Sequence, residues 1–158
     1  MHRKVSKNRS KNMAAISGKD TKPELLLRSY LHKNGLRYRL HCEQLPGRPD
    51  LVFPRSKAVI FVHGCFWHSH NCQKFSVPKT NKEFWARKLY QNQKRDEENI
   101  ASLLLQRWRV LIVWECALRG KTSICPRLIV EEIRAWIYQH TTNFLEIRGN
   151  GSQAYKSA

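Results

Sequence analysis

The chain has 158 residues, the length of one ordinary domain, and its 41% hydrophobic content suits a globular core that needs no disulfide scaffold. It carries 29 Lys and Arg against 12 Asp and Glu, a net charge of +17 at pH 7. A folded chain this basic predicts a polyanionic partner, most often nucleic acid, although a merely solvated basic surface has the same composition. No apolar run approaches the ~18 residues of a membrane span, so we expect no membrane partner. We also expect no secretory signal peptide.

Charge and apolar pattern divide the chain into three expected segments. Residues 1–20 are a basic arm that orders on its partner. Within the arm, Met13 and Ile16 are spaced as one helical turn, which either packs on the body or wedges into a DNA groove. Residues 21–148 form a single folded domain, and residues 149–158 form a flexible C-terminal tail.

The first expected helix begins at the capping box Thr21-Lys-Pro-Glu24 and ends near Gly35. Strands are expected at 36–40, 51–53, 58–62 and 110–114, a long helix with bends at 82–107, and a last helix after Pro126. This order predicts an α/β fold. Because the long helix is a crossover, the strands at 58–62 and 110–114 should be parallel, with their carboxyl ends at one edge of the sheet.

Potential metal ligands are concentrated at that edge. Cys65, His70 and Cys72 follow the strand at 58–62, and Cys116 follows the strand at 110–114. Together they would complete the Cys₃His set of a structural zinc site; the alternative is buried free thiols beside packed imidazoles. Cys42 and Cys125 have no obvious partners, and we interpret them as core or surface thiols.

An acid and two further histidines are expected at the same edge. If Phe53 pairs with Ala58 in the hairpin, Asp50 faces the region of Phe61 and lies close to His63. A carboxylate that can hold Mg²⁺, together with His63 and His68, suits metal-assisted hydrolysis of a phosphodiester. The alternative for Asp50 is a turn residue after Pro49.

Glu24 also has two interpretations. As the N3 residue of a capping box it is explained without any function, and it can also hold a metal-bound water near Asp50. Phe66, Trp67 and Trp85 lie among basic residues, where exposed aromatics stack on bases or insert between them. Trp108, Trp114 and Trp136 fall in regular elements and are expected in the core.

Five motifs closely resemble the very short patch repair endonucleases of bacteria. They are Arg9-Ser-Lys-Asn-Met13, Leu45-Pro-Gly-Arg-Pro-Asp-Leu-Val-Phe53, Phe61-Val-His-Gly-Cys-Phe-Trp-His68, Glu83-Phe-Trp85 and Trp108-Arg-Val-Leu-Ile-Val-Trp-Glu-Cys116. The resemblance implies a restriction-endonuclease-like mixed sheet flanked by helices, with a structural zinc site. The resemblance runs from about residue 9 to about 120, and residues 121–158 match weakly. It implies that the domain expected at 21–148 is an endonuclease that nicks duplex DNA 5′ to the thymine of a T·G mismatch, after deamination of 5-methylcytosine.

The resemblance also implies roles for individual residues. Asp50 would bind Mg²⁺ with the backbone carbonyl of Val62, and His68 would activate the attacking water. His63 would support the phosphate or the leaving group, and Glu24 would act in the outer shell. The acid-x-lysine usual in the wider nuclease superfamily is absent at Phe61-Val-His63, which fits a histidine-assisted mechanism.

The remaining implied roles concern zinc and DNA. The zinc ligands are Cys65, His70, Cys72 and Cys116. The residues that insert beside the mismatch are Phe66, Trp67 and Trp85 from the major groove and Met13 and Ile16 from the minor groove. We expect a cytoplasmic, nucleoid-associated monomer, with mismatch-repair proteins as candidate further partners. Two other functions stay open: a non-catalytic zinc module that binds nucleic acid, and a restriction or junction-cleaving nuclease of the same fold.

Overall fold

The computed structural model describes residues 18–149, so Met13, Ile16 and most of the expected basic arm lie outside the described residues. The expected flexible tail also lies outside them, except for Gly149. The elements in chain order are α2 (Lys22–Lys33), β1 (Arg39–Leu40), β2 (Leu51–Phe53), the 3-10 turn η1 (Pro54–Ser56), β3 (Ala58–His63), α3 (Lys82–Leu105), β4 (Arg109–Trp114), α4 (Glu115–Leu118), α5 (Pro126–Gln139) and β5 (Phe144–Ile147).

The five strands form one mixed sheet in the order β1-β2-β3-β4-β5. The first two pairs of neighbours are antiparallel, and the last two, β3 with β4 and β4 with β5, are parallel. Phe53 pairs with Ala58 and Leu51 with Ile60, so the expected hairpin register is confirmed. The expected parallel pair is also confirmed, and it brings His63 opposite Trp114 at the carboxyl edge of the sheet.

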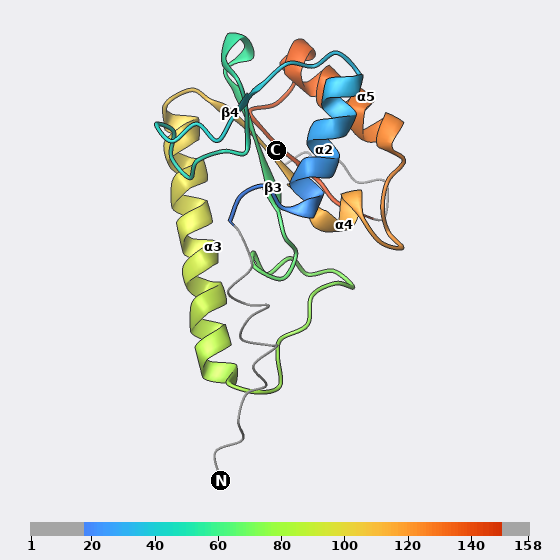
Figure 1. Cartoon of the computed structure of the whole chain (residues 1–158). Helices are drawn as coiled ribbons and strands as arrows, with labels where there is room; N and C mark the ends of the chain where they lie inside the picture. The colour runs from blue at the N-terminus through green and yellow to red at the C-terminus, as the bar shows by residue number, and fades with distance from the viewer. Residues whose placement is uncertain (1–17, 150–158) are drawn as a thin grey trace.

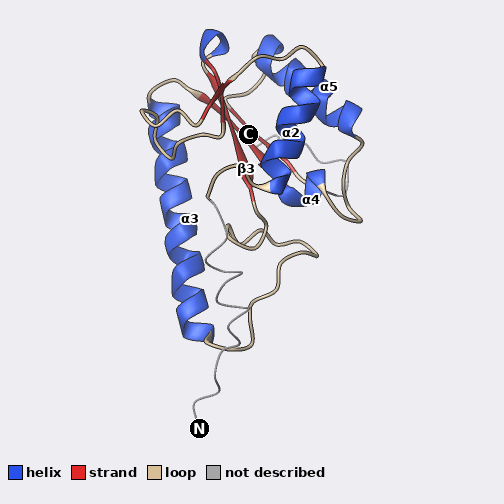
Figure 2. Cartoon of the chain, viewed as in Figure 1, coloured by secondary structure: helices blue, strands red, loops and turns tan. Residues whose placement is uncertain are grey.

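Helices cover both faces of the sheet (Figures 1 and 2). Since side chains alternate along a strand, Ile60 of β3 packs on the face covered by α2 and α5. Its neighbours Val59 and Phe61 pack on the other face, with Leu103 of α3. The mixed sheet flanked by helices agrees with the predicted fold class.

Helix α2 begins as its sequence predicts. The Thr21 hydroxyl accepts a hydrogen bond from the backbone N–H of Glu24 (3.4 Å), and Leu27 and Leu31 are completely buried beneath the helix. Gly35 follows its end at a φ of 81°, a conformation that glycine adopts without strain. The cap therefore fixes Glu24 in the first turn of α2.

Several elements differ from the expectations. Only Arg39–Leu40 of the expected strand 36–40 is extended, and α3 is one continuous helix. Trp108 lies in the turn before β4 and is partly exposed, so its expected place in a regular element was wrong. Strand β5 was not predicted from the sequence; it has four residues, in which buried Leu145 and Ile147 alternate with more exposed neighbours.

No helix among residues 18–149 is long and apolar enough to cross a membrane.

Candidate active site and metal centre

The four predicted zinc ligands come together in the structure. Cys65, His70 and Cys72 lie on the loop after β3, and Cys116 lies on α4, directly after β4. Their ligand atoms all lie within 4.8 Å of one another. Two backbone hydrogen bonds fold the loop around the cluster: His70 N donates to Cys65 O (2.9 Å) and Cys72 N to His70 O (2.8 Å). The set can therefore hold a metal ion.

Hydrogen bonding within the cluster shifts the pKa values of its two buried thiols, Cys65 and Cys116, in opposite directions. The hydrogen bond from Cys65 lowers the pKa of the Cys116 thiol, and His70 and the backbone N–H of Gly149 act in the same direction. The Gly149 N–H lies 3.2 Å from the Cys116 sulfur. The same thiol pair, together with burial, raises the pKa of Cys65. Three thiols and one imidazole are the donor set that a closed, tetrahedral zinc site uses.

Trp114 connects this cluster to a second group of side chains. Its ring stacks on the ring of His70, with centroids 4.1 Å apart and planes 12° apart. Its edge meets the rings of His63 at 5.3 Å and His68 at 6.4 Å. The metal centre and these two imidazoles therefore share one rigid aromatic neighbour at the end of β4.

The two histidines form a stacked pair that is held by an acid from α3. The rings of His63 and His68 are parallel within 3°, with centroids 3.8 Å apart. Nδ1 of His68 lies 2.5 Å from Oδ2 of Asp96, and these three residues form a further group of possible metal ligands. An aspartate at this position orients the imidazole and stabilises its protonated form. The opposite nitrogen, Nε2, is left to act on a substrate or water.

Asp96 was not among the site residues predicted from the sequence. It lies on α3 within a run of charged residues, Arg95-Asp-Glu-Glu98, that resembles an ordinary solvated helix surface. The usable signal was topological: a crossover helix between parallel strands can return a side chain to the edge where both strands end. Burial, and then the charge of His68, lower the pKa of His63 well below its usual value, so His63 is neutral near pH 7.

Asp50 lies at the same edge but on the α2 side of the sheet. Its Oδ2 accepts a hydrogen bond from the backbone N–H of Val62 (2.7 Å), one residue before His63. Burial raises the pKa of Asp50 to about 7, against the lowering effect of the Val62 hydrogen bond, and the nearby Glu24 carboxylate raises it further. The positive charges of His41 and His68 lower the pKa of Asp50 but do not outweigh its burial, and a divalent cation would compensate the carboxylate further.

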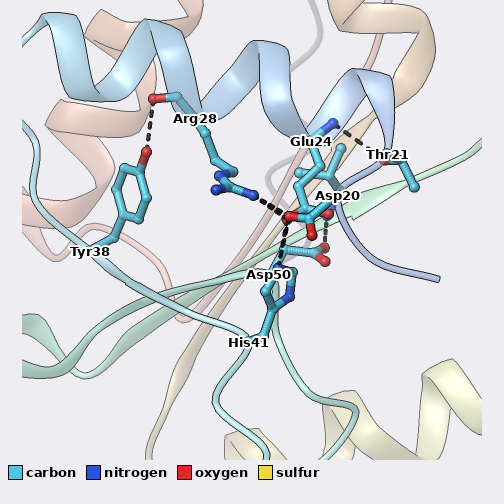
Figure 3. Close-up of polar contacts among 8 residues, drawn as sticks. Asp20, Thr21, Glu24, Arg28, Tyr38, His41 and Asp50 are labelled. Atoms are coloured by element: carbon cyan, nitrogen blue, oxygen red, sulfur yellow. Dashed lines mark hydrogen bonds and ion pairs between the residues drawn. The ribbon is translucent and has the colours of Figure 1, made fainter. Parts of the chain in front are cut away.

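Glu24 belongs to a third cluster, around the first turn of α2. The Arg28 guanidinium lies 2.6 Å from Asp20 Oδ1 and 3.3 Å from Glu24 Oε1. Nε2 of His41 lies 3.1 Å from Glu24 Oε1 and 3.5 Å from Asp20 Oδ1. Figure 3 shows these side chains gathered beside Asp50.

The expected meeting of Asp50 with both imidazoles is therefore indirect. Among the described residues, the groups of three or more possible metal ligands do not include Asp50. Asp50 touches β3 through the amide of Val62, and the charge of His68 lowers its pKa. This edge of the sheet thus combines the Asp50 carboxylate, which could bind a cation, with the Asp96–His68 pair. Metal-assisted hydrolysis uses groups of both kinds.

The three predicted DNA-inserting aromatics form one cluster between the loop and α3. The Phe66 ring centroid lies 5.1 Å from that of Trp67 and 5.3 Å from that of Trp85. Phe66 and Trp67 are partly exposed, but Trp85 is only 9% exposed. The expectation that Trp85 is exposed was wrong, because the other two rings pack against it. Asn92 of α3 donates to the carbonyl of Trp67 (3.0 Å) and fixes the loop to the helix.

Known proteins are similar to this chain in sequence. A family model described as DNA mismatch endonuclease Vsr matches residues 2–74. The DNA mismatch endonuclease Vsr of Escherichia coli (strain K12) is 49% identical over 129 residues, which make up 82% of this chain and 83% of that protein. The Type II nicking enzyme V.XorIIP of Xanthomonas oryzae pv. oryzae is 44% identical over 116 residues, covering 73% of this chain and 85% of the relative.

A third relative, the Type II nicking enzyme V.NmeAIP of Neisseria meningitidis serogroup A, is 41% identical over 132 residues, covering 82% of this chain and 94% of the relative. These matches confirm the resemblance carried by the sequence motifs, and the mixed sheet flanked by helices is consistent with the restriction-endonuclease-like fold. The chain belongs to the DNA mismatch endonuclease Vsr family.

Proposed function

We propose that this chain is a Mg²⁺-dependent DNA endonuclease that nicks duplex DNA on the 5′ side of the thymine in a T·G mismatch and so initiates very short patch repair. Membership of the Vsr family supports the activity on mismatched DNA. The observation that carries the chemistry is the arrangement at the sheet edge: Asp50 held by Val62 on one side and the Asp96–His68 pair on the other.

In this proposal a divalent cation, when bound, supplies Lewis-acid stabilisation of charge on the scissile phosphate. Asp50 is its protein ligand, with the carbonyl of Val62 as a second, and Glu24 orients water in the outer shell. The residues fit a cation, because Asp50 is a partly buried carboxylate whose ionised form is disfavoured. Mg²⁺ retains most of its water ligands, so one carboxylate and one carbonyl are an adequate protein contribution.

His68 accepts the proton of the attacking water at Nε2, while Asp96 holds its Nδ1–H and stabilises the imidazolium that forms. Neutral His63, stacked against it, donates a hydrogen bond to the phosphate or to the leaving oxygen. Hydrolysis at one phosphodiester leaves a nick.

Mismatch selection is assigned to the aromatic cluster. Inserting side chains between base pairs costs a few kcal/mol per unstacked step, and a poorly stacked T·G pair lowers that cost. Stacking on the partly exposed Phe66 and Trp67 returns about 1–3 kcal/mol per base, and Trp85 would stack on a base once those two rings move away from it. Met13 and Ile16, outside the described residues, are proposed to enter from the minor groove. Exposed basic residues along α3, among them Lys82, Arg87, Lys88 and Lys94, would contact phosphates without selecting sequence.

The proposal also includes a zinc site, the oligomeric state, the cellular location and the partners of the enzyme. Zn²⁺ held by Cys65, His70, Cys72 and Cys116 would stiffen the loop that carries His68 and the aromatics. Residues 21–148 would act as one domain and as a monomer, since only one strand of the mismatch is cut. The enzyme would work in the bacterial cytoplasm at the nucleoid, and mismatch-repair proteins are the candidate partners.

End-labelled duplexes test the proposal. Wild-type protein is expected to nick a T·G duplex in Mg²⁺, to stop in EDTA, and to leave the matched C·G duplex intact. Asp50→Ala should abolish nicking while the protein stays folded and keeps its zinc. Equal cutting of matched duplex would instead favour a restriction nuclease, preference for branched DNA a junction nuclease, and tight binding without scission a zinc-bearing binding module.

A further inference from the structure

His41 contacts both segments that carry the candidate acidic residues. Its backbone N–H donates to the carbonyl oxygen of Asp50 (3.3 Å). Its ring nitrogen Nε2 lies 3.1 Å from Glu24 Oε1, on the helix that packs against the sheet at this point. Figure 3 shows the His41 ring beside the first turn of α2, with Asp50 next to it. One residue therefore touches Asp50 through its main chain and Glu24 through its side chain.

The backbone of His41 is held in an unusual conformation. Its φ is 45°, in the left-handed region that residues other than glycine rarely occupy. The short strand β1 ends at Leu40, so this turn occurs where the chain leaves the sheet, opposite Asp50. Strained conformations of this kind persist where the surroundings hold them, and they concentrate at functional sites.

Burial explains why Glu24 needs such a neighbour. The Glu24 side chain is 1% exposed, and a buried carboxylate is costly unless nearby groups compensate its charge. Arg28 lies against it from α2 itself, but the Arg28 guanidinium is shared with Asp20. Nε2 of His41 is also shielded from water and forms no aligned hydrogen bond within the described part of the chain. Its Nε2 contacts Glu24 Oε1 at 3.1 Å and, like the Arg28 guanidinium, is shared with Asp20, whose Oδ1 lies 3.5 Å away.

We propose that His41 is a positioning residue of the nuclease reaction, which fixes the Glu24 and Asp50 carboxylates relative to each other. Asp50 and Glu24 would then present their carboxylate oxygens at a fixed separation to a bound cation and its water. This inference rests on the proposed function, because it assigns Asp50 as the cation ligand. Residues that orient metal ligands from outside typically change metal affinity or activity by about 10–100-fold when they are replaced.

Three substitutions of His41 distinguish the contribution of its imidazole ring from that of its backbone conformation. His41→Gly removes the imidazole and relieves the positive φ, so the fold should be retained. His41→Gln restores a polar N–H group able to approach Glu24, and His41→Ala removes the ring while keeping the strain. His32→Ala, which removes an exposed imidazole near the end of α2, is the matched control.

Each full-length, zinc-loaded variant is measured in two ways. Single-turnover nicking of the T·G duplex gives the rate constant and the half-saturating Mg²⁺ concentration. Mn²⁺ binding, followed by loss of the free-ion electron paramagnetic resonance signal, gives cation affinity without any reaction. His41→Gly and His41→Ala should weaken Mn²⁺ binding and slow nicking by about 10–100-fold, with duplex affinity unchanged. His41→Gln should recover most of the loss, and His32→Ala should match wild type.

The inference is overturned if His41→Gly binds Mn²⁺ and nicks as wild type does. It is also overturned if His41→Gln is as impaired as His41→Gly, because the ring would then serve something other than its polar contact. Failure of the proposed function looks different: wild type itself would not nick the T·G duplex, while the Mn²⁺ affinities would still report on His41.

Discussion

Asp96 and His68, 28 residues apart in sequence, meet at 2.5 Å between Oδ2 and Nδ1. His68 lies in the loop after β3, and Asp96 lies in the middle of α3, the helix that crosses over from β3 to β4. The contact fixes which nitrogen of His68 is free, and the stacked ring of His63 limits how far the imidazole can rotate. The geometry thus assigns to α3 a chemical role besides covering the sheet.

Asp96→Asn tests that role. An amide can still contact Nδ1 but carries no charge to stabilise the imidazolium, so we expect nicking to lose much of the ~10²–10⁴-fold that general-base catalysis contributes. Duplex affinity and melting temperature should stay close to wild type, because Asp96 is a partly exposed side chain on a long helix. Single-turnover nicking and fluorescence anisotropy are the measurements. A rate equal to that of wild type would remove Asp96 from the mechanism.

Asp50→Asn should stabilise the protein at high pH when no divalent cation is present. The folded-state pKa of Asp50 is raised from an ordinary 3.8 to about 7, so the folded protein binds this proton more tightly than the unfolded chain does. Its contribution to stability is therefore present below pH 4 and is lost as the pH rises toward 7. Asparagine has no charge to bury, and at pH 8 it should add on the order of 2–4 kcal/mol, since one pKa unit is worth about 1.4 kcal/mol.

Thermal unfolding at pH 4 and pH 8, in EDTA-free buffer without Mg²⁺, checks the direction of this predicted change in stability. The variant should gain melting temperature over wild type at pH 8 and little at pH 4. Adding Mg²⁺ at pH 8 should stabilise wild type and leave Asp50→Asn unchanged. A variant that is destabilised equally at both pH values would show instead that the contact with Val62 dominates.

Cys116→Ser should lower metal content and stability together. Cys116 is 2% exposed, and its sulfur lies 3.5 Å from Nδ1 of His70. Loss of one thiolate from a four-ligand site removes binding energy that is also folding energy. Cys125→Ser is the matched control, since Cys125 is exposed at the start of α5 and lies outside the cluster. Elemental analysis that finds one zinc per chain in both variants would take Cys116 out of the ligand set.

The metal cluster was predictable because its signal is local. Three of its members lie within eight residues, and a pair of buried strands indicated where Cys116 would join them. The hairpin register was predictable for a similar reason: a short turn between two apolar runs leaves few pairings. The first helix carried its own start signal in Thr21 and Glu24.

The remaining parts of the site depend on long-range packing. Asp96 and His41 are ordinary polar residues in their local sequences, and only the crossing of α3 and the turn after β1 bring them to the edge. Trp85 was interpreted as a residue that stacks on bases because aromatics there interleave with basic residues, but Phe66 and Trp67 fold back over it. Strand β5 is too short to be distinguished from a loop until β4 is present to pair with it.

Gly149→Ala should weaken the metal centre from a distance of 33 residues in sequence. A Cβ at this position would lie 2.4 Å from the carbonyl oxygen of Cys116 and 2.6 Å from the hydroxyl of Thr122, so the backbone after β5 must move. That movement breaks the N–H donation from Gly149 to the Cys116 sulfur, which lowers the pKa of that thiol. We expect a loss of about 1–3 kcal/mol in stability and faster release of zinc to a chelator. Gly18→Ala is the control, because a Cβ there meets nothing within 4 Å. Equal zinc release from both variants would show that the segment after β5 does not support the metal centre.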